Sequence, residues 1–174
     1  MRVKIIALVL LSAASLSSQA RMPVPRYTAS KNLTRPEGYR EWMFVGSNLG
    51  IGYDENPGRS AFKNIYIQRE AFAVYRESGK FPEKTMLVME VFSAGEKASP
   101  ARRGQFEDKF LGIEVALKDS SAFADKWAYF NFISQKGQLA EAKAFPKEAC
   151  WSCHNEHGAS DNVFVQFYPA LRDK

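Results

Sequence analysis

The chain has 174 residues, 45% of them hydrophobic and 13% aromatic, and a formal net charge of +5. This length suits one domain with a proper core. The modest basic surplus forms no basic run and no interleaving of basic with aromatic residues, so we expect no nucleic-acid partner. The 13 phenylalanines favour a sheet-rich core or an apolar pocket.

The first twenty residues have the three-part pattern of a secretory signal peptide. Two basic residues, an apolar run over 5–11 and a small-x-small site at 18–20 follow one another. A retained membrane anchor is the alternative, but the run is shorter than the about 20 residues that a spanning helix needs. We expect cleavage after Ala20, which leaves residues 21–174 as an exported, periplasmic protein without a membrane span.

Residues 21–40 are rich in proline and polar residues, so we expect an N-terminal arm with a short helix near Tyr39. Residues 41–174 are expected to form one domain. Within it, alternation and β-branched or aromatic residues predict about five or six strands. These strands are expected at 41–47, 61–68, 85–94, 110–119, 127–134 and 162–169.

Other segments of the domain are predicted as connections. A turn is expected at 54–60, and a helix over 69–80 that ends at Gly79. A hairpin loop is expected at 95–105, and an N-capped helical turn at 120–127. Adjacent strands without regular crossover helices favour an antiparallel sheet, so we predict an α+β fold that is mainly antiparallel sheet with short helices.

Both cysteines and both histidines of the chain lie within the eight residues CWSCHNEH, at 150–157. Cys150, Cys153 and His154 form C-x-x-C-H, the attachment signature of a c-type haem. In this chemistry two thiols add across the porphyrin vinyl groups, and the adjacent histidine supplies a nitrogen to the iron. We therefore predict one covalent haem c, with the two cysteines as anchors and His154 as the proximal iron ligand.

Three alternatives remain for this segment. Two cysteines in an exported protein often form a disulfide. A C-x-x-C pair can be a redox dithiol, although no thioredoxin-like pattern surrounds it here. A zinc site needs four ligands, and only His157 could join the other three locally. Haem is favoured because a histidine directly after C-x-x-C is improbable by chance in a chain with two histidines.

The ligand on the other face of the iron decides the class of cytochrome. Electron carriers close that face with methionine or a second histidine. His157 follows His154 on the same side of the ring, so it cannot reach around. The methionines of the exported chain are Met22, Met43, Met86 and Met89. A strand methionine is more often core filler than a ligand, so the sequence favours an open or water-bound position, with electron transfer through Met86 or Met89 as the alternative.

Five stretches in this order, EWMFVGSNLG, AFKNIYIQREAF, SGKFPEKTMLVMEVF, WAYFNF and FPKEACWSCHNEHGASDNVFVQFYP, resemble the cytochrome P-460 superfamily. The resemblance covers almost all of residues 21–174, and its last block is the most specific. It implies a periplasmic, homodimeric, β-rich protein with a c-type haem.

The superfamily holds two functional kinds. Cytochrome P-460 proper oxidises hydroxylamine, and it carries a lysine covalently bonded to the porphyrin and a distal carboxylate that acts as base. Cytochrome c′-beta keeps the fold and a five-coordinate haem without the lysine link. Its distal pocket is capped by phenylalanines, and it binds nitric oxide and carbon monoxide.

The resemblance places the linking lysine of the enzymes within 85–92, where this chain has none. Lys80 and Lys84 lie just before it, in an expected turn. Phe62 and Phe92 best match the two distal phenylalanines of cytochrome c′-beta, with plain core packing as the alternative for both. An apolar lid of this kind would offer no hydrogen bond to polar ligands, which favours nitric oxide and carbon monoxide.

The distal carboxylate of the enzymes comes from the stretch after the haem motif. Asp161 is the nearest candidate and Glu156 a poorer one, and Asp161 could equally cap a turn. We therefore expect a cytochrome c′-beta that binds nitric oxide for sensing, storage or detoxification, with another cytochrome as a possible redox partner. The alternatives are a hydroxylamine-oxidising enzyme, with Lys80 or Lys84 as the link, and an electron carrier.

Overall fold

The structure is a computed structural model that describes residues 21–52, 60–96, 100 and 102–172. Its centre is one antiparallel sheet with the strand order β2-β3-β4-β5-β6, so that neighbours in the chain are neighbours in the sheet. The strands are β2 (Met43–Leu49), β3 (Ala61–Ile67), β4 (Met86–Glu96), β5 (Gln105–Lys118) and β6 (Trp127–Asn131).

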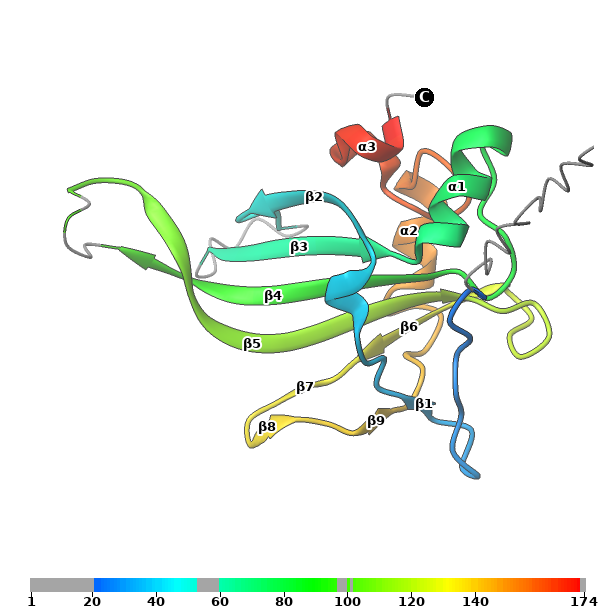
Figure 1. Cartoon of the computed structure of the whole chain (residues 1–174). Helices are drawn as coiled ribbons and strands as arrows, with labels where there is room; N and C mark the ends of the chain where they lie inside the picture. Colours follow the sequence, from blue (N-terminus) through cyan, green and yellow to red (C-terminus); the bar gives the residue numbers. More distant parts are fainter. Residues whose placement is uncertain (1–20, 53–59, 97–99, 101, 173–174) are drawn as a thin grey trace, which may run out of the picture.

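Shorter elements cover this sheet. Two small ladders are formed by β1 (Leu33–Thr34) with β9 (Glu141–Ala142) and by β7 (Ile133–Ser134) with β8 (Gly137–Gln138). The helical elements are η1 (Tyr39–Glu41), α1 (Arg69–Ser78), α2 (Trp151–His157), η2 (Val165–Phe167) and α3 (Pro169–Arg172). Figure 1 shows the α-helices above the sheet and the short strands below it.

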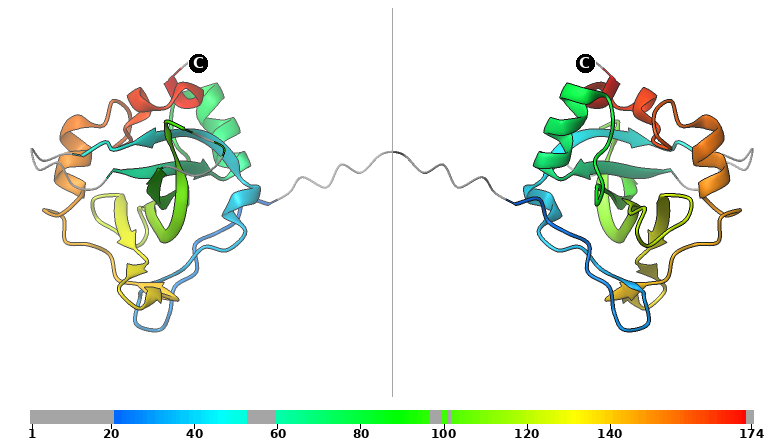
Figure 2. Two further views of the ribbon diagram at one scale, coloured as in Figure 1. Left: turned by 90° about the vertical axis from the view of Figure 1, so that its left-hand side faces the viewer. Right: turned by 90° about the vertical axis from the view of Figure 1, so that its right-hand side faces the viewer.

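Each face of the sheet carries its own apolar cluster, because successive side chains of a strand point to opposite faces. On the face covered by the α-helices, Ile65, Leu87 and Tyr129 are buried. On the other face, Val88 and Phe130 pack with the N-terminal arm and with the segment that carries β7 to β9. In Figure 2, α2 and the arm lie on opposite sides of the sheet. We call the first surface the helix face and the second the arm face.

The segment that connects β3 to β4 through α1 shows how the sequence determines where these elements begin and end. Ala71 and Tyr75 are spaced four apart and bury one side of the helix. The helix ends at Gly79, whose φ of 73° lies in the left-handed region that glycine adopts without strain. The buried side chain of Gln68 receives the backbone N–H of Met86 and donates to the carbonyl of Pro23, which joins α1, β4 and the arm.

The α+β class and the predominance of antiparallel strands are confirmed. The strand predicted at 162–169 is wrong, since this segment forms η2 and the start of α3. Its run of apolar residues is buried on the helix face, and a short apolar run does not distinguish a strand from a buried helical turn. At 120–127 the chain forms turns, with the Asp119 carboxylate accepting the N–H groups of Ser121 and Ala122.

Some expectations concern residues outside the described ranges. The signal peptide at 1–20 lies there, and so does most of the turn expected at 54–60. Within the described ranges, no helix is long and apolar enough to cross a membrane. The division of the remaining chain into an arm at 21–40 and a domain at 41–174 stays a prediction.

Candidate haem site

The two cysteines lie at the start of the short helix α2. Cys150 is its N-cap residue, Cys153 follows three positions later, and the backbone N–H of His154 donates to the Cys150 carbonyl at 3.1 Å. Residues three and four apart on a helix share one side. Both thiols are free and partly buried, so the pair is available for attachment to a cofactor.

His154 is held by contacts around its ring. Its Nδ1 lies 2.9 Å from the carbonyl oxygen of Asn162, and the ring centroid lies 4.2 Å from that of Tyr129 and 4.4 Å from that of Phe164. Since a carbonyl can only accept, Nδ1 carries the proton and Nε2 keeps a free lone pair. Burial lowers the pKa of His154, and the hydrogen bond to Asn162 opposes this shift only in part. The ring is therefore in the form that binds iron.

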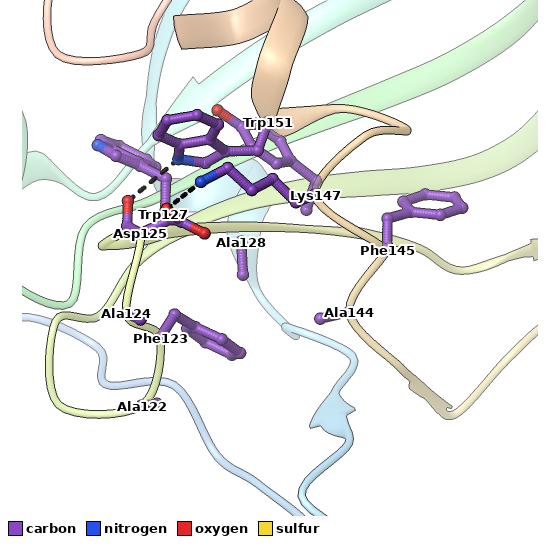
Figure 3. Close-up of a pocket in the computed structure, with 11 residues that line it drawn as sticks. Ala122, Phe123, Ala124, Asp125, Trp127, Ala128, Ala144, Phe145, Lys147 and Trp151 are labelled. Atoms are coloured by element: carbon purple, nitrogen blue, oxygen red, sulfur yellow. Dashed lines mark hydrogen bonds and ion pairs between the residues drawn. The ribbon is translucent and has the colours of Figure 1, made fainter.

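The amino end of α2 is anchored to the loop before β6. Lys147 forms an ion pair with Asp125, and its Nζ lies 4.0 Å from the centroid of the Trp151 ring. The indole N–H of Trp151 donates to the Asp125 carbonyl at 3.1 Å. Figure 3 shows this group beside a surface pocket of about 210 Å³ whose lining also includes Phe123 and Phe145. These contacts fix the segment that carries Cys150.

A row of cross-strand partners crosses the helix face close to α2. The row consists of one residue from each of β3, β4, β5 and β6, each paired with the next across the ladder: Ile65, Met89, Glu114 and Asn131. Partners in an antiparallel pair point to the same face, so Glu114 shares the helix face with the buried Ile65. The negative charge of Glu114 contributes to the raised pKa of Cys150, after the larger effect of burial. Glu114 therefore lies within electrostatic range of the haem-attachment motif.

Glu114 has the properties of a functional carboxyl. Burial raises its pKa above the ordinary value, and only Lys63 opposes that shift. Across the described part of the chain, the carboxylate of Glu114 makes no hydrogen bond or ion pair. A partly buried carboxyl with a raised pKa and no structural partner is a candidate functional residue.

Lys63 lies on the same face, two residues before Ile65 on β3. Its Nζ donates to the carbonyl of Ile51 at 2.9 Å, in the segment that follows β2. A lysine at an inward-facing strand position is unusual, because its charge loses hydration there. The helix face next to α2 thus combines an amine and a carboxyl above the strands β3 and β5.

Phe62 and Phe92 are brought together, but on the arm face. They are direct partners in the ladder between β3 and β4, and Phe62 alternates with Lys63. The Phe92 ring lies 5.3 Å from that of Phe110, over which the Arg40 guanidinium also sits. Their role as a distal cap stays a prediction, and their position on the face turned away from α2 lends it no support.

The lysines and carboxylates chosen from the sequence have other surroundings. Lys80 is exposed, and Lys84 pairs with Asp119 at the start of β4. Asp161 receives the Lys118 ammonium at 2.6 Å and the Trp127 indole N–H at 3.2 Å.

Exposed side chains follow the haem motif. Glu156 is largely exposed, with its carboxylate 3.8 Å from His157. In the described ranges, no group of three or more His, Cys, Asp or Glu residues could hold a metal ion, so a zinc cluster gains no support.

Among the methionines, Met86 is buried on the arm face, whereas Met89 lies on the helix face in the row of Glu114.

Comparison with known proteins decides the family. The family model of Cytochrome P460 matches residues 36–165, well over half of the chain. This chain belongs to the cytochrome P460 family. A search of curated proteins gave no match. Membership of the cytochrome P460 family makes the chain a haem protein, and the free cysteines and oriented histidine of α2 fit that cofactor.

The sequence analysis did not select Lys63 or Glu114 in this cytochrome P460 domain. The alternation of side chains along β3 and β5 could have identified both residues from the sequence. Lys63 shares its phase with Ile65 and Ile67, and Glu114 shares its phase with Ala116 of β5. A charged residue in the apolar phase of a strand is a candidate site residue.

Proposed function

We propose that this chain is a cytochrome P460 that oxidises hydroxylamine at a covalently attached c-type haem. The observation that carries the proposal is the presence of Lys63 and Glu114 on one surface, the helix face, with Glu114 within electrostatic range of Cys150. The family resemblance assigns hydroxylamine oxidation to members with a lysine bonded to the porphyrin and a carboxylate base. Lys63 and Glu114 supply both side-chain types on one surface.

Each residue has a distinct proposed role. Cys150 and Cys153 hold the porphyrin through thioether bonds, and His154 binds iron through Nε2, because Nδ1 donates to Asn162. Lys63 is the lysine that bonds to the porphyrin, in place of Lys80 or Lys84. Glu114 replaces Asp161 as the proton acceptor.

Glu114 suits the transfer of a proton from a small nitrogen substrate. When bound, the haem supplies an iron that takes the substrate nitrogen and accepts its electrons. Oxidation of hydroxylamine also releases protons, and a base must stand within hydrogen-bond reach of them. Burial raises the pKa of the Glu114 carboxyl, which makes its carboxylate a stronger base than an exposed glutamate.

The setting of the reaction follows from the sequence. The signal peptide pattern supports export to the periplasm, where haem is attached to C-x-x-C-H motifs. The electrons taken from hydroxylamine need an acceptor, and we propose a partner cytochrome. We also propose a homodimer, on the basis of the family resemblance.

Binding of nitric oxide or carbon monoxide by a cytochrome c′-beta is the second candidate. It is favoured by the apolar side chains of the row that holds Glu114, namely Ile65 and Met89. Such side chains offer no hydrogen bond to a ligand on iron, and this disfavours polar ligands more than neutral diatomic gases. In this alternative Lys63 would not bond to the porphyrin.

The proposal is tested on the exported holoprotein. Proteolysis followed by mass spectrometry is expected to show haem joined to the peptide of 150–154 and also to the peptide that holds Lys63. The variant Lys63→Met is expected to lose the second attachment and at least tenfold in hydroxylamine oxidation. Lys80→Met, which changes an exposed lysine outside the site, is the matched control. A single attachment in the wild-type protein, with no oxidation of hydroxylamine, would transfer the assignment to the gas-binding alternative.

A further inference from the structure

We propose that Asp161, clamped between Lys118 and Trp127, is a positioning residue that sets the electron donation of His154 to the haem iron. It acts through the backbone carbonyl of the next residue, Asn162. The inference rests on the proposed haem attachment at His154, but not on whether the iron oxidises hydroxylamine or binds nitric oxide.

The clamp has two donors on one carboxylate. The Lys118 Nζ donates to Oδ2 of Asp161 at 2.6 Å, and the Trp127 indole N–H donates to Oδ1 at 3.2 Å. The side chain of Lys118 is only 13% exposed, and Trp127 is buried. The same Lys118 ammonium donates to the Phe81 carbonyl at 2.7 Å. Charge-assisted bonds of this kind are short and resist screening when little water reaches them.

The backbone that follows is in an unfavourable conformation. Asp161 and Asn162 have φ values of 47° and 60°, two consecutive non-glycine residues in the left-handed region. Asn and Asp tolerate this region better than other residues, but it needs outside support. In the described part of the structure, the buried side-chain amide nitrogen of Asn162 has no hydrogen-bond partner. The turn is closed by the backbone N–H of Val163, which donates to the Ser160 carbonyl at 2.8 Å, and the clamped carboxylate of Asp161 adds to this support.

This turn orients the backbone carbonyl of Asn162 toward the ring of His154, the proposed iron ligand. The carbonyl oxygen of Asn162 accepts from Nδ1 of His154 at 2.9 Å and from the Tyr129 hydroxyl at 3.2 Å. The turn also closes tightly on the end of α2, because a Cβ atom at Gly158 would lie 2.9 Å from the carbonyl carbon of Asn162. The direction of the Asn162 carbonyl thus depends on how residues 161 and 162 are held.

The chemical consequence concerns the imidazole. A hydrogen bond from Nδ1–H makes the ring a stronger electron donor through Nε2, and such outer contacts tune metal sites. Stronger donation stabilises ferric over ferrous iron, which lowers the midpoint potential. If the clamp is released, the carbonyl turns, the hydrogen bond weakens and the midpoint potential rises.

The test compares variants as holoproteins. Asp161→Asn keeps the shape of the side chain and removes its charge, and Lys118→Gln removes the cation. We expect both to raise the midpoint potential, so that the ratio of ferric to ferrous haem at a fixed potential falls about tenfold, or 59 mV for one electron. We expect the iron–histidine stretching band of the ferrous form to move to lower frequency. Lys118→Arg, which keeps a cation, is expected to restore both values toward wild type.

The matched control is Lys84→Gln. It breaks a similar ion pair, with Asp119, the residue that follows Lys118 in the chain. It is expected to lower stability without moving the potential or the stretching band. Wild-type potential and band position in Asp161→Asn and Lys118→Gln would overturn the clamp while leaving the proposed function intact. Absence of covalent haem from the wild-type protein, seen in its pyridine haemochrome spectrum, would overturn both.

Discussion

At the scale of single residues, Glu114 differs from Glu90 and Asp119, the carboxylates that are buried in the described part of the chain. Those two form ion pairs with Arg40 and Lys84. Glu114 has only the distant charge of Lys63 to oppose the burial that raises its pKa. A carboxyl held this way costs stability, which is typical of residues kept for chemistry.

Glu114→Gln is expected to slow hydroxylamine oxidation by about 10²–10⁴-fold, the usual contribution of a general base. Since burial raises the pKa of Glu114, the wild-type rate is expected to fall with decreasing pH at a pH above the ordinary glutamate value of 4.5. The variant is expected to lack this limb of the pH–rate profile. Steady-state rates between pH 4 and 8 check both points.

Glu156→Gln is the control for this variant, because Glu156 is exposed beside the haem motif. It is expected to keep the wild-type rate and profile. Equal rates for Glu114→Gln and wild type, at equal haem content, would show that Glu114 is not the proton acceptor.

At the scale of elements, the helix face depends on the close approach of β2 to the C-terminal segment. Gly46 lies at the irregularity of β2 and has a φ of 155°, and a Cβ there would lie 2.9 Å from the Tyr168 ring. A bulge of this kind bends a strand and increases its twist. The glycine therefore lets η2 and α3 pack on β2.

Gly46→Ala is expected to lower the free energy of unfolding by about 1–3 kcal/mol, from backbone strain and from displacement of Tyr168. Gly52→Ala is the control, since no atom of the described residues lies within 4 Å of a Cβ at that position. Urea unfolding of the two holoproteins gives the comparison. Equal stability of the two variants would mean that the C-terminal segment does not pack on Gly46.

The elements also show what the sequence could predict. The alternation in AFKNIYIQ and the glycine after 69–78 predicted β3 and α1, because local pattern and tertiary packing agree there. The segment 162–169 was predicted as a strand because its apolar run is continuous. Its burial is set by packing with Val45 and Tyr75 in the cluster of the helix face, and such long-range contacts leave no local period.

Of the candidate site, likewise, one part could be predicted from the sequence and the other could not. C-x-x-C-H is a local chemical motif, so Cys150, Cys153 and His154 could be chosen from the sequence. Lys63 and Glu114 are 51 positions apart and come together only through the register of β3, β4 and β5. Register is a property of the assembled sheet, so their association needed the structure.

At the scale of the whole molecule, Asp119 joins distant parts of the chain. The Tyr27 hydroxyl of the arm donates to it at 2.8 Å, Lys84 pairs with it at the start of β4, and the Ser121 hydroxyl donates at 2.6 Å. Burial alone would raise the pKa of Asp119, but these donors outweigh it and bring the pKa down to about 2. The carboxylate is therefore favoured by folding.

This shift predicts the response to acid. A carboxyl whose pKa is lower in the folded state stabilises the protein fully above its unfolded pKa, near 4, and loses that contribution as the pH falls to about 2. Asp119→Asn is expected to be less stable than wild type at pH 7 and to lose less stability between pH 4 and 2. Urea midpoints across this range test it. Asp108→Asn, an exposed site, is the control, and parallel curves for wild type and Asp119→Asn would contradict the role.

The central claim is that Lys63 modifies the haem and that the chain is thereby an enzyme. The most direct measurement is the absorption spectrum of the ferrous holoprotein, in wild type and in Lys63→Met. The account predicts a Soret band moved far to the red in wild type and returned to the usual c-haem position in the variant. A wild-type Soret band already at the usual position, together with a nitric oxide adduct, would contradict the claim and favour the gas-binding alternative.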